Sequence, residues 1–165
     1  MPTENDFAQF LRDFRATVVD ATARLREIPA AESRQKNAPD DWAPIEILGH
    51  LVDSAANNHQ RIVRAQLEDN PAMPGYAQQA WVDLHGYKRR EWRELIELWR
   101  ALNQQLLAAA EAVPESARSR TCTIAGSEPL TIEFVFEDYL EHMLHHLQHI
   151  GIDVADLRSG AVAAD

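Results

Sequence analysis

Four long stretches of the chain repeat apolar residues at alternating spacings of three and four, the pattern of an amphipathic helix. They span the following approximate ranges: residues 4–28, 42–68, 88–113 and 131–158. Proline breaks the pattern after the first three stretches, and Thr3 and Thr131 are suitable N-caps for the first and fourth. Each helix must bury its apolar face against the others, so the sequence predicts an all-α fold, an antiparallel four-helix bundle. A chain of 165 residues is expected to form a single domain over residues 1–165.

One connector between these helices is longer than a compact bundle requires. The connector at residues 70–87, between the second and third helices, carries prolines, glycines and the aromatic residues Tyr76 and Trp81. A segment of this length is expected to line or cover a functional site. Residues 117–130 alternate threonine with apolar residues before a glycine, which fits either a short β-hairpin or an irregular loop.

Charge and cysteine content exclude several classes of partner. The net charge of −10 at pH 7 disfavours binding to nucleic-acid phosphates or to an anionic membrane surface. No stretch approaches the ~20 consecutive apolar residues that a membrane-spanning helix needs. The single cysteine, Cys122, has no partner for an internal disulfide, which indicates a reducing compartment. We therefore expect a cytoplasmic protein with no nucleic-acid partner and no membrane partner.

A histidine-rich run lies inside the fourth predicted helix. Residues 141–149 hold four of the seven histidines of the chain. Histidines four apart on a helix face the same way, about 6 Å apart along the axis, so two of them can bind one divalent metal ion. The helical period places His142 and His146 nearest the bundle interior, His145 on the outer face and His149 beside the pair. The alternative interpretation is an exposed polar face whose histidines are incidental.

Spacing does not decide which residue completes such a site. His59 falls on the apolar stripe of the second helix, whereas His50 lies on roughly the opposite side, and His85 lies in the long connector. The sequence lacks the His-Glu-x-x-His motif of metalloproteases and the paired Glu-x-x-His motifs of di-iron bundles. A mononuclear site with three histidine ligands and an open coordination position is the arrangement we expect.

Two segments resemble the DinB/YfiT-like family. They are residues 42–54, with the sequence WAPIEILGHLVDS, and residues 139–150, with the sequence YLEHMLHHLQHI. The resemblance extends over about residues 40–150 and is strongest to the YfiT branch. It implies a four-helix bundle whose metal is held by one histidine of the second helix and two, four apart, of the fourth. Those positions carry over to His50, His142 and His146.

The resemblance also implies a chemistry. The family metal is zinc or nickel, and imidazole ligands suit both. Its members are described as metal-dependent hydrolases or as thiol S-transferases that use a low-molecular-weight thiol such as bacillithiol or mycothiol, and they often form homodimers. The resemblance therefore implies a metal-dependent hydrolase or thiol S-transferase acting on a small-molecule substrate, with a homodimer as the candidate assembly. A non-catalytic, stress-related metal-binding module is the alternative.

Five further residues are candidates for supporting roles around the metal. Asp53 is placed to orient a ligand histidine as a hydrogen-bond acceptor, and His149 flanks the ligand pair. Asn57 and Arg61 are candidates for binding a substrate carboxylate, and Tyr76 for contacting the substrate. The alternative for these residues is an ordinary place on a solvated helix face or in a surface salt bridge.

Overall fold

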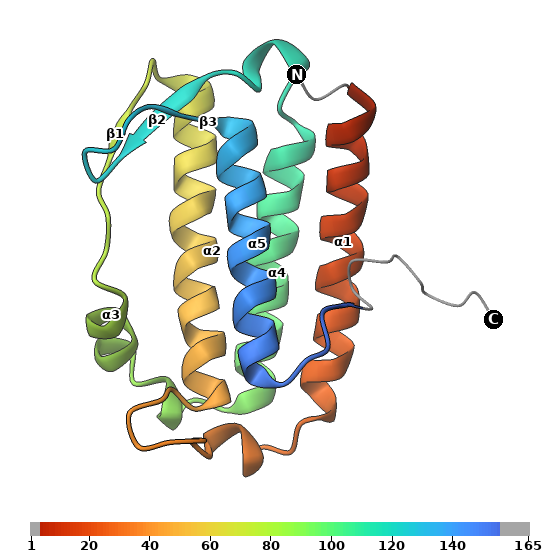
Figure 1. The fold of residues 1–165 in the computed structure, drawn as a ribbon, viewed down its shortest axis with the longest axis vertical. Coiled ribbons are helices and arrows are strands. Elements are labelled where there is room, and N and C mark those ends of the chain that lie inside the picture. The colour runs from red at the N-terminus through yellow and green to blue at the C-terminus, as the bar shows by residue number, and fades with distance from the viewer. Residues whose placement is uncertain (1–3, 156–165) are drawn as a thin grey trace, which may run out of the picture.

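The computed structural model describes the backbone of residues 4–155 and the side chains of residues 7–155 (Figure 1). The predicted four-helix bundle is confirmed, and its long helices are α1 (Glu4–Glu27), α2 (Pro44–Leu67), α4 (Trp92–Glu111) and α5 (Ile132–Ile150). A fifth, short helix, α3 (Gln78–His85), lies within the long connector. Single 3-10 turns occur at Glu32–Arg34, Tyr87–Arg89 and Glu115–Ala117. The expected cap Thr3 lies outside the described residues.

The helices are not arranged in the order of the sequence. Helix α2 packs against both α4 and α5, and α1 packs mainly against α4. Arg15 and Arg26 of α1 form ion pairs with Glu111 and Glu97 of α4, so these two helices run antiparallel. In Figure 1, α2 and α4 start at the same end of the bundle and run in the same direction. This direction is possible because the connector between them runs back along the outside of the bundle.

A small sheet lies at the end of the bundle where α2 and α4 finish. It joins the connector between α2 and α4 to the connector between α4 and α5. Strand β2 (Thr121–Ile124) pairs parallel with β1 (Ala72–Met73) and antiparallel with β3 (Leu130–Thr131). Strands β2 and β3 form a short β-hairpin. Of the two structures that the sequence allows for residues 117–130, the hairpin is therefore the one present. Arg120 fixes this sheet to α2, because its guanidinium donates hydrogen bonds of 2.8 Å to the carbonyls of Ala65 and Glu68.

Two helix boundaries differ from the prediction. Helix α4 begins at Trp92 rather than near residue 88, because a 3-10 turn occupies Tyr87–Arg89. Helix α5 ends at Ile150 rather than at residue 158, because Gly151 adopts a left-handed conformation with φ of 102°. That conformation favours glycine and commonly terminates a helix. Residues 151–154 are not helical, and residues 156–158 lie outside the described part of the chain.

A buried polar pair lies in the core between the helices. The hydroxyl of Tyr139 donates a hydrogen bond of 2.6 Å to Oδ1 of Asn103, and Nδ2 of Asn103 donates to the Trp99 carbonyl. Both partners are almost fully buried. Within residues 4–155, no helix combines the length and apolar character needed to cross a bilayer.

Removing the Tyr139 hydroxyl is expected to destabilise the fold. Tyr139→Phe leaves Oδ1 of Asn103 without its donor in a site closed to water, at a cost of about 1–3 kcal/mol. Urea unfolding followed by circular dichroism measures the loss. The double variant Tyr139→Phe, Asn103→Leu removes both polar partners and should recover part of it. A Tyr139→Phe protein as stable as the wild type would show that the pair adds nothing to stability.

Candidate metal centre

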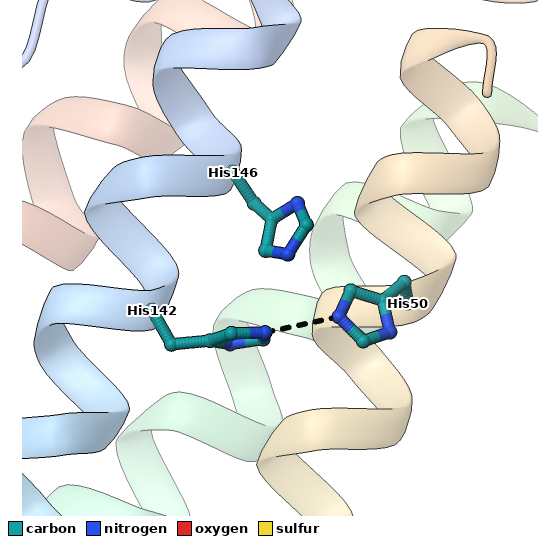
Figure 2. A group of neighbouring side chains, drawn as sticks. All are labelled: His50, His142 and His146. Carbon is teal, nitrogen blue, oxygen red and sulfur yellow. Dashed lines mark hydrogen bonds between the residues drawn. The ribbon is translucent and has the colours of Figure 1, made fainter. Parts of the chain in front are cut away.

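Three histidines from two helices meet near one end of the bundle. His50 lies on the second turn of α2, and His142 and His146 lie one turn apart on α5. Their side chains point toward one another across the space between the helices (Figure 2). One ring nitrogen from each residue lies within 4.8 Å of the other two. Nε2 of His50 lies 3.1 Å from Nε2 of His142.

The surrounding residues hold the three rings in place. His50 is completely buried, and its ring lies 5.2 Å from the Trp42 ring and 6.4 Å from the Tyr76 ring. Nδ1 of His142 lies 3.4 Å from the Ser54 hydroxyl, one turn after His50 on α2. This contact leaves Nε2 of His142 directed toward His50.

Burial keeps these histidines neutral. Desolvation, with a smaller contribution from the neighbouring His142, lowers the pKa of His50 to about 4. Desolvation and the other histidines lower the pKa of His146 to about 3. The pKa of His142 is also lowered, chiefly by burial. All three imidazoles therefore have free lone pairs at neutral pH, which is the state that binds a metal.

The residues fit a tetrahedral divalent metal. Metal–nitrogen bonds of ~2.0–2.1 Å in tetrahedral geometry place two ligand nitrogens about 3.3 Å apart. The 3.1 Å between the two Nε2 atoms is close to that value. Nδ1 of His50 and Nδ1 of His146 are buried without a hydrogen-bond partner among residues 7–155. The fit to a metal rests on the donor type and the spacing, because neutral imidazole is a common ligand of zinc and similar ions.

A cavity opens on each side of the cluster. The larger, of about 400 Å³, is lined by His146, His149, Trp42 and the acidic loop that precedes α2. The smaller, of about 260 Å³, is lined by His142 together with residues of α2 and of the connector, among them Arg61 and Tyr76. A molecule in either cavity can therefore reach the histidines from its own side.

Asp53 has partners other than those expected. Its Oδ1 accepts a hydrogen bond of 2.6 Å from the Tyr87 hydroxyl and lies 3.1 Å from Nδ1 of His85. Burial raises the pKa of the Asp53 carboxyl, and the hydrogen bond from Tyr87 opposes this effect. The carboxylate thus anchors the end of the connector to α2 one turn from His50.

The remaining histidines are not part of the group of three, although the rings of His145 and His149 lie 5.3 Å and 5.9 Å from the ring of His146. His59 is partly buried further along α2, and His85 lies beside Asp53. His145 is exposed, as its helical position predicts, and His149 is exposed at the rim of the larger cavity.

Among the lining residues of the smaller cavity that the sequence did not single out, Asn58 and Ser54 lie closest to His50 in the sequence of α2. Asn58 lines this cavity, whereas Asn57 donates its amide to the Asp53 carbonyl of its own helix. Ser54 also lines the cavity and contacts His142. Both follow His50 at multiples of four on α2, so the position of the buried histidine is the signal that identifies them.

The fold and the site together define a class: helical-bundle proteins with a three-histidine candidate metal centre between two of their helices. Residues 13–150, most of the chain, match the sequence model of the DinB superfamily. The chain therefore belongs to the DinB superfamily, as the two histidine segments indicated.

Relatives within this family include proteins of two bacilli. A protein of Halalkalibacterium halodurans is 26% identical over 129 residues, 78% of this chain and 73% of that protein. The YfiT protein of Bacillus subtilis is 26% identical over 110 residues, 66% of this chain and 62% of that protein. Both carry the name "Putative metal-dependent hydrolase".

Two solved structures share the fold. YfiT from Bacillus subtilis, reported as a probable metal-dependent hydrolase with an unusual four-helix bundle topology, superposes with a TM-score of 0.83 at 19% identity. The match covers 97% of this chain and 91% of that one. A mycothiol-dependent maleylpyruvate isomerase superposes with a TM-score of 0.77 at 16% identity, covering 97% of this chain and 68% of that one. At these identities the likeness establishes the fold alone.

Proposed function

We propose that this protein is a single-metal enzyme that transfers a low-molecular-weight thiol to a small electrophilic substrate. His50, His142 and His146 are the proposed ligands of one divalent ion, zinc or nickel. The observation that carries the proposal is the convergence of three neutral imidazoles, one buried and two partly buried, each of His142 and His146 lining its own cavity. Structural zinc sites are closed by four protein ligands, whereas catalytic sites keep a position open for a reactant.

The chain supplies binding and orientation around that ion. When bound, the metal acts as a Lewis acid that lowers the pKa of a water or thiol ligand. Ser54 fixes the ring of His142 through Nδ1, and Trp42 and Tyr76 shield the ring of His50 from solvent. The cavities give two reactants separate approaches to one centre, which favours a two-substrate transfer. Mycothiol dependence in an isomerase of the same fold supports a thiol as one reactant.

Hydrolysis is the second candidate reaction. It is supported by the names of the relatives from Halalkalibacterium halodurans and Bacillus subtilis. In this case a metal held by the three histidines would supply an activated water, and one cavity would hold the substrate. Assays of thiol conjugation to an electrophile and of ester or amide hydrolysis distinguish the two reactions.

Metal removal tests the proposal directly. Protein purified without a histidine tag is expected to contain about one equivalent of zinc or nickel, in keeping with three imidazole ligands. Treatment with a chelator should abolish thiol conjugation, and added metal should restore it. Elemental analysis and rate measurements before and after chelation give the result. Bound metal without any chelator-sensitive rate would favour the alternative, a non-catalytic metal-binding module.

A further inference from the structure

A row of buried polar side chains runs along α2 from the three histidines. Ser54, Asn58 and Arg61 follow His50 at spacings of four, four and three, so all four lie on one face of the helix. Ser54 and Asn58 are only 3% and 7% exposed. Burying polar groups costs free energy relative to burying apolar ones. The row therefore calls for an explanation beyond the packing of the bundle.

Hydrogen bonds link the row from end to end. Nη1 of Arg61 donates to Oδ1 of Asn58 over 3.3 Å, and Nδ2 of Asn58 donates to the Ser54 carbonyl over 2.9 Å. The Ser54 hydroxyl in turn contacts His142. These contacts hold Arg61 in a fixed relation to the candidate metal centre.

Arg61 is a cation with unused donors. The guanidinium carries five N–H groups, and its bond to the neutral Asn58 is its one polar contact among residues 7–155. By contrast Arg64, one turn later on α2, is exposed and paired with Glu68. The stem of Arg61 borders an apolar space lined by Cys122 and Ile132, and burial lowers its pKa. A partly desolvated guanidinium that forms no ion pair with a carboxylate of residues 7–155, although Asp138 lies nearby, is a strong recognition element for a carboxylate.

The free side of this row faces the smaller cavity. Arg61, Asn58 and Ser54 line it on the α2 side, and Tyr76 and His142 line it from the connector and from α5. Its volume of about 260 Å³ suits a small organic acid. Asp138 is the acidic residue that lines it, and this side chain is exposed.

We propose that this cavity binds the carboxylate of a small acidic substrate, with Arg61 recognising the charge and His142 at the reactive end. The inference names the substrate class for the proposed function and rests on that function. Arg61 lies seven residues beyond Ser54, about 10 Å along the axis, and helical side chains lean back toward the N-terminus. The substrate therefore has its reacting atom a few bonds from its carboxylate. One cation beside Asp138 suits a monocarboxylate better than a phosphate dianion.

Binding of a charged and a neutral isostere tests this inference. Calorimetric titration of the metal-loaded full chain with benzoate is expected to give at least about tenfold tighter binding than with benzamide. Arg61→Gln should abolish this preference, because it should weaken benzoate binding far more than benzamide binding. Arg64→Gln removes the same charge from the same helix outside the cavity and should retain the preference. Inorganic phosphate should bind more weakly than benzoate.

Two further variants keep the test informative if Arg61→Gln fails to fold. Arg61→Lys keeps the charge but loses the planar pair of donors, so benzoate affinity should fall in part. Asp138→Asn removes the repelling carboxylate and should tighten benzoate binding severalfold. Equal binding of benzoate and benzamide by the wild type would overturn the inference. Benzoate binding that instead requires the metal would be lost on chelation but unchanged in Arg61→Gln. That result would place the carboxylate on the metal and would also overturn the inference.

Failure of this inference is distinguishable from failure of the proposed function. Metal content and chelator-sensitive turnover are measured on every variant alongside binding. A wild type that prefers benzoate through Arg61 but contains no metal contradicts the proposed function and leaves the carboxylate site standing. A metal-loaded, active protein whose benzoate preference survives Arg61→Gln contradicts the carboxylate site alone.

Discussion

Replacing His50 with alanine is expected to abolish metal binding as completely as replacing His142 or His146. Each variant removes one of the three proposed ligands. Mutations of groups that merely support a ligand typically cost 10–100-fold in metal affinity, so loss of a ligand should cost at least about a hundredfold. Competition titration of zinc against a colorimetric chelator measures the affinity, and elemental analysis measures the bound metal.

His59→Ala is the matched control on the same helix. His59 lies outside the cluster and is partly buried, so its loss should leave metal affinity unchanged. The opposite outcome, with metal lost in His59→Ala and retained in His50→Ala, would refute the site. A fully folded His50→Ala protein by circular dichroism is needed to read the result, because His50 is completely buried.

Sequence periodicity alone does not identify which histidine of α2, His50 or His59, lies in the cluster. Assigning an inner face from an apolar stripe assumes that a helix is buried on one side. Helix α2 contacts α4, α5, α3 and two 3-10 turns, and nearly every residue from 45 to 55 is buried. A polar residue opposite the stripe therefore lies inside the protein. The resemblance to the DinB/YfiT-like family selected His50 where periodicity alone favoured His59.

The orientation of helix α5 in the bundle agrees with its sequence, because this helix has a solvated side. His145 and His149 are exposed, and the residues of its apolar stripe that the structure describes as helical lie in the core or against it. Its histidine pair could therefore be ranked by angle alone. The cavity residues of α2 could not be identified by angle alone. Asn57 and Asn58 are neighbours in the sequence, but their side chains point about 100° apart around the helix. Nor does local sequence reveal that the connector folds back along α2, since that path depends on tertiary contacts such as Tyr87 with Asp53.

Gly49→Ala is expected to destabilise the protein, although helix propensity predicts the reverse. Alanine in a helix interior is favoured over glycine by about 1 kcal/mol. Here a Cβ at residue 49 would overlap the ring of Tyr87, which packs directly on the glycine. Overpacking costs about 1–3 kcal/mol, and displacing the Tyr87 hydroxyl leaves the buried Asp53 carboxylate without its short hydrogen bond. We expect a net loss of about 2–4 kcal/mol in the free energy of unfolding, measured in urea.

Two controls separate the clash from propensity. Ala56→Gly, on the exposed side of α2, should cost only the propensity term of about 1 kcal/mol. In a Tyr87→Leu background the clash is relieved, so adding Gly49→Ala should cost far less than in the wild type.

Gly49 also precedes His50, and displacement of Tyr87 moves the connector that shields this histidine. Gly49→Ala should therefore weaken zinc binding as well, whereas Ala56→Gly should not. A Gly49→Ala protein more stable than the wild type would mean that Tyr87 does not pack on this glycine in solution.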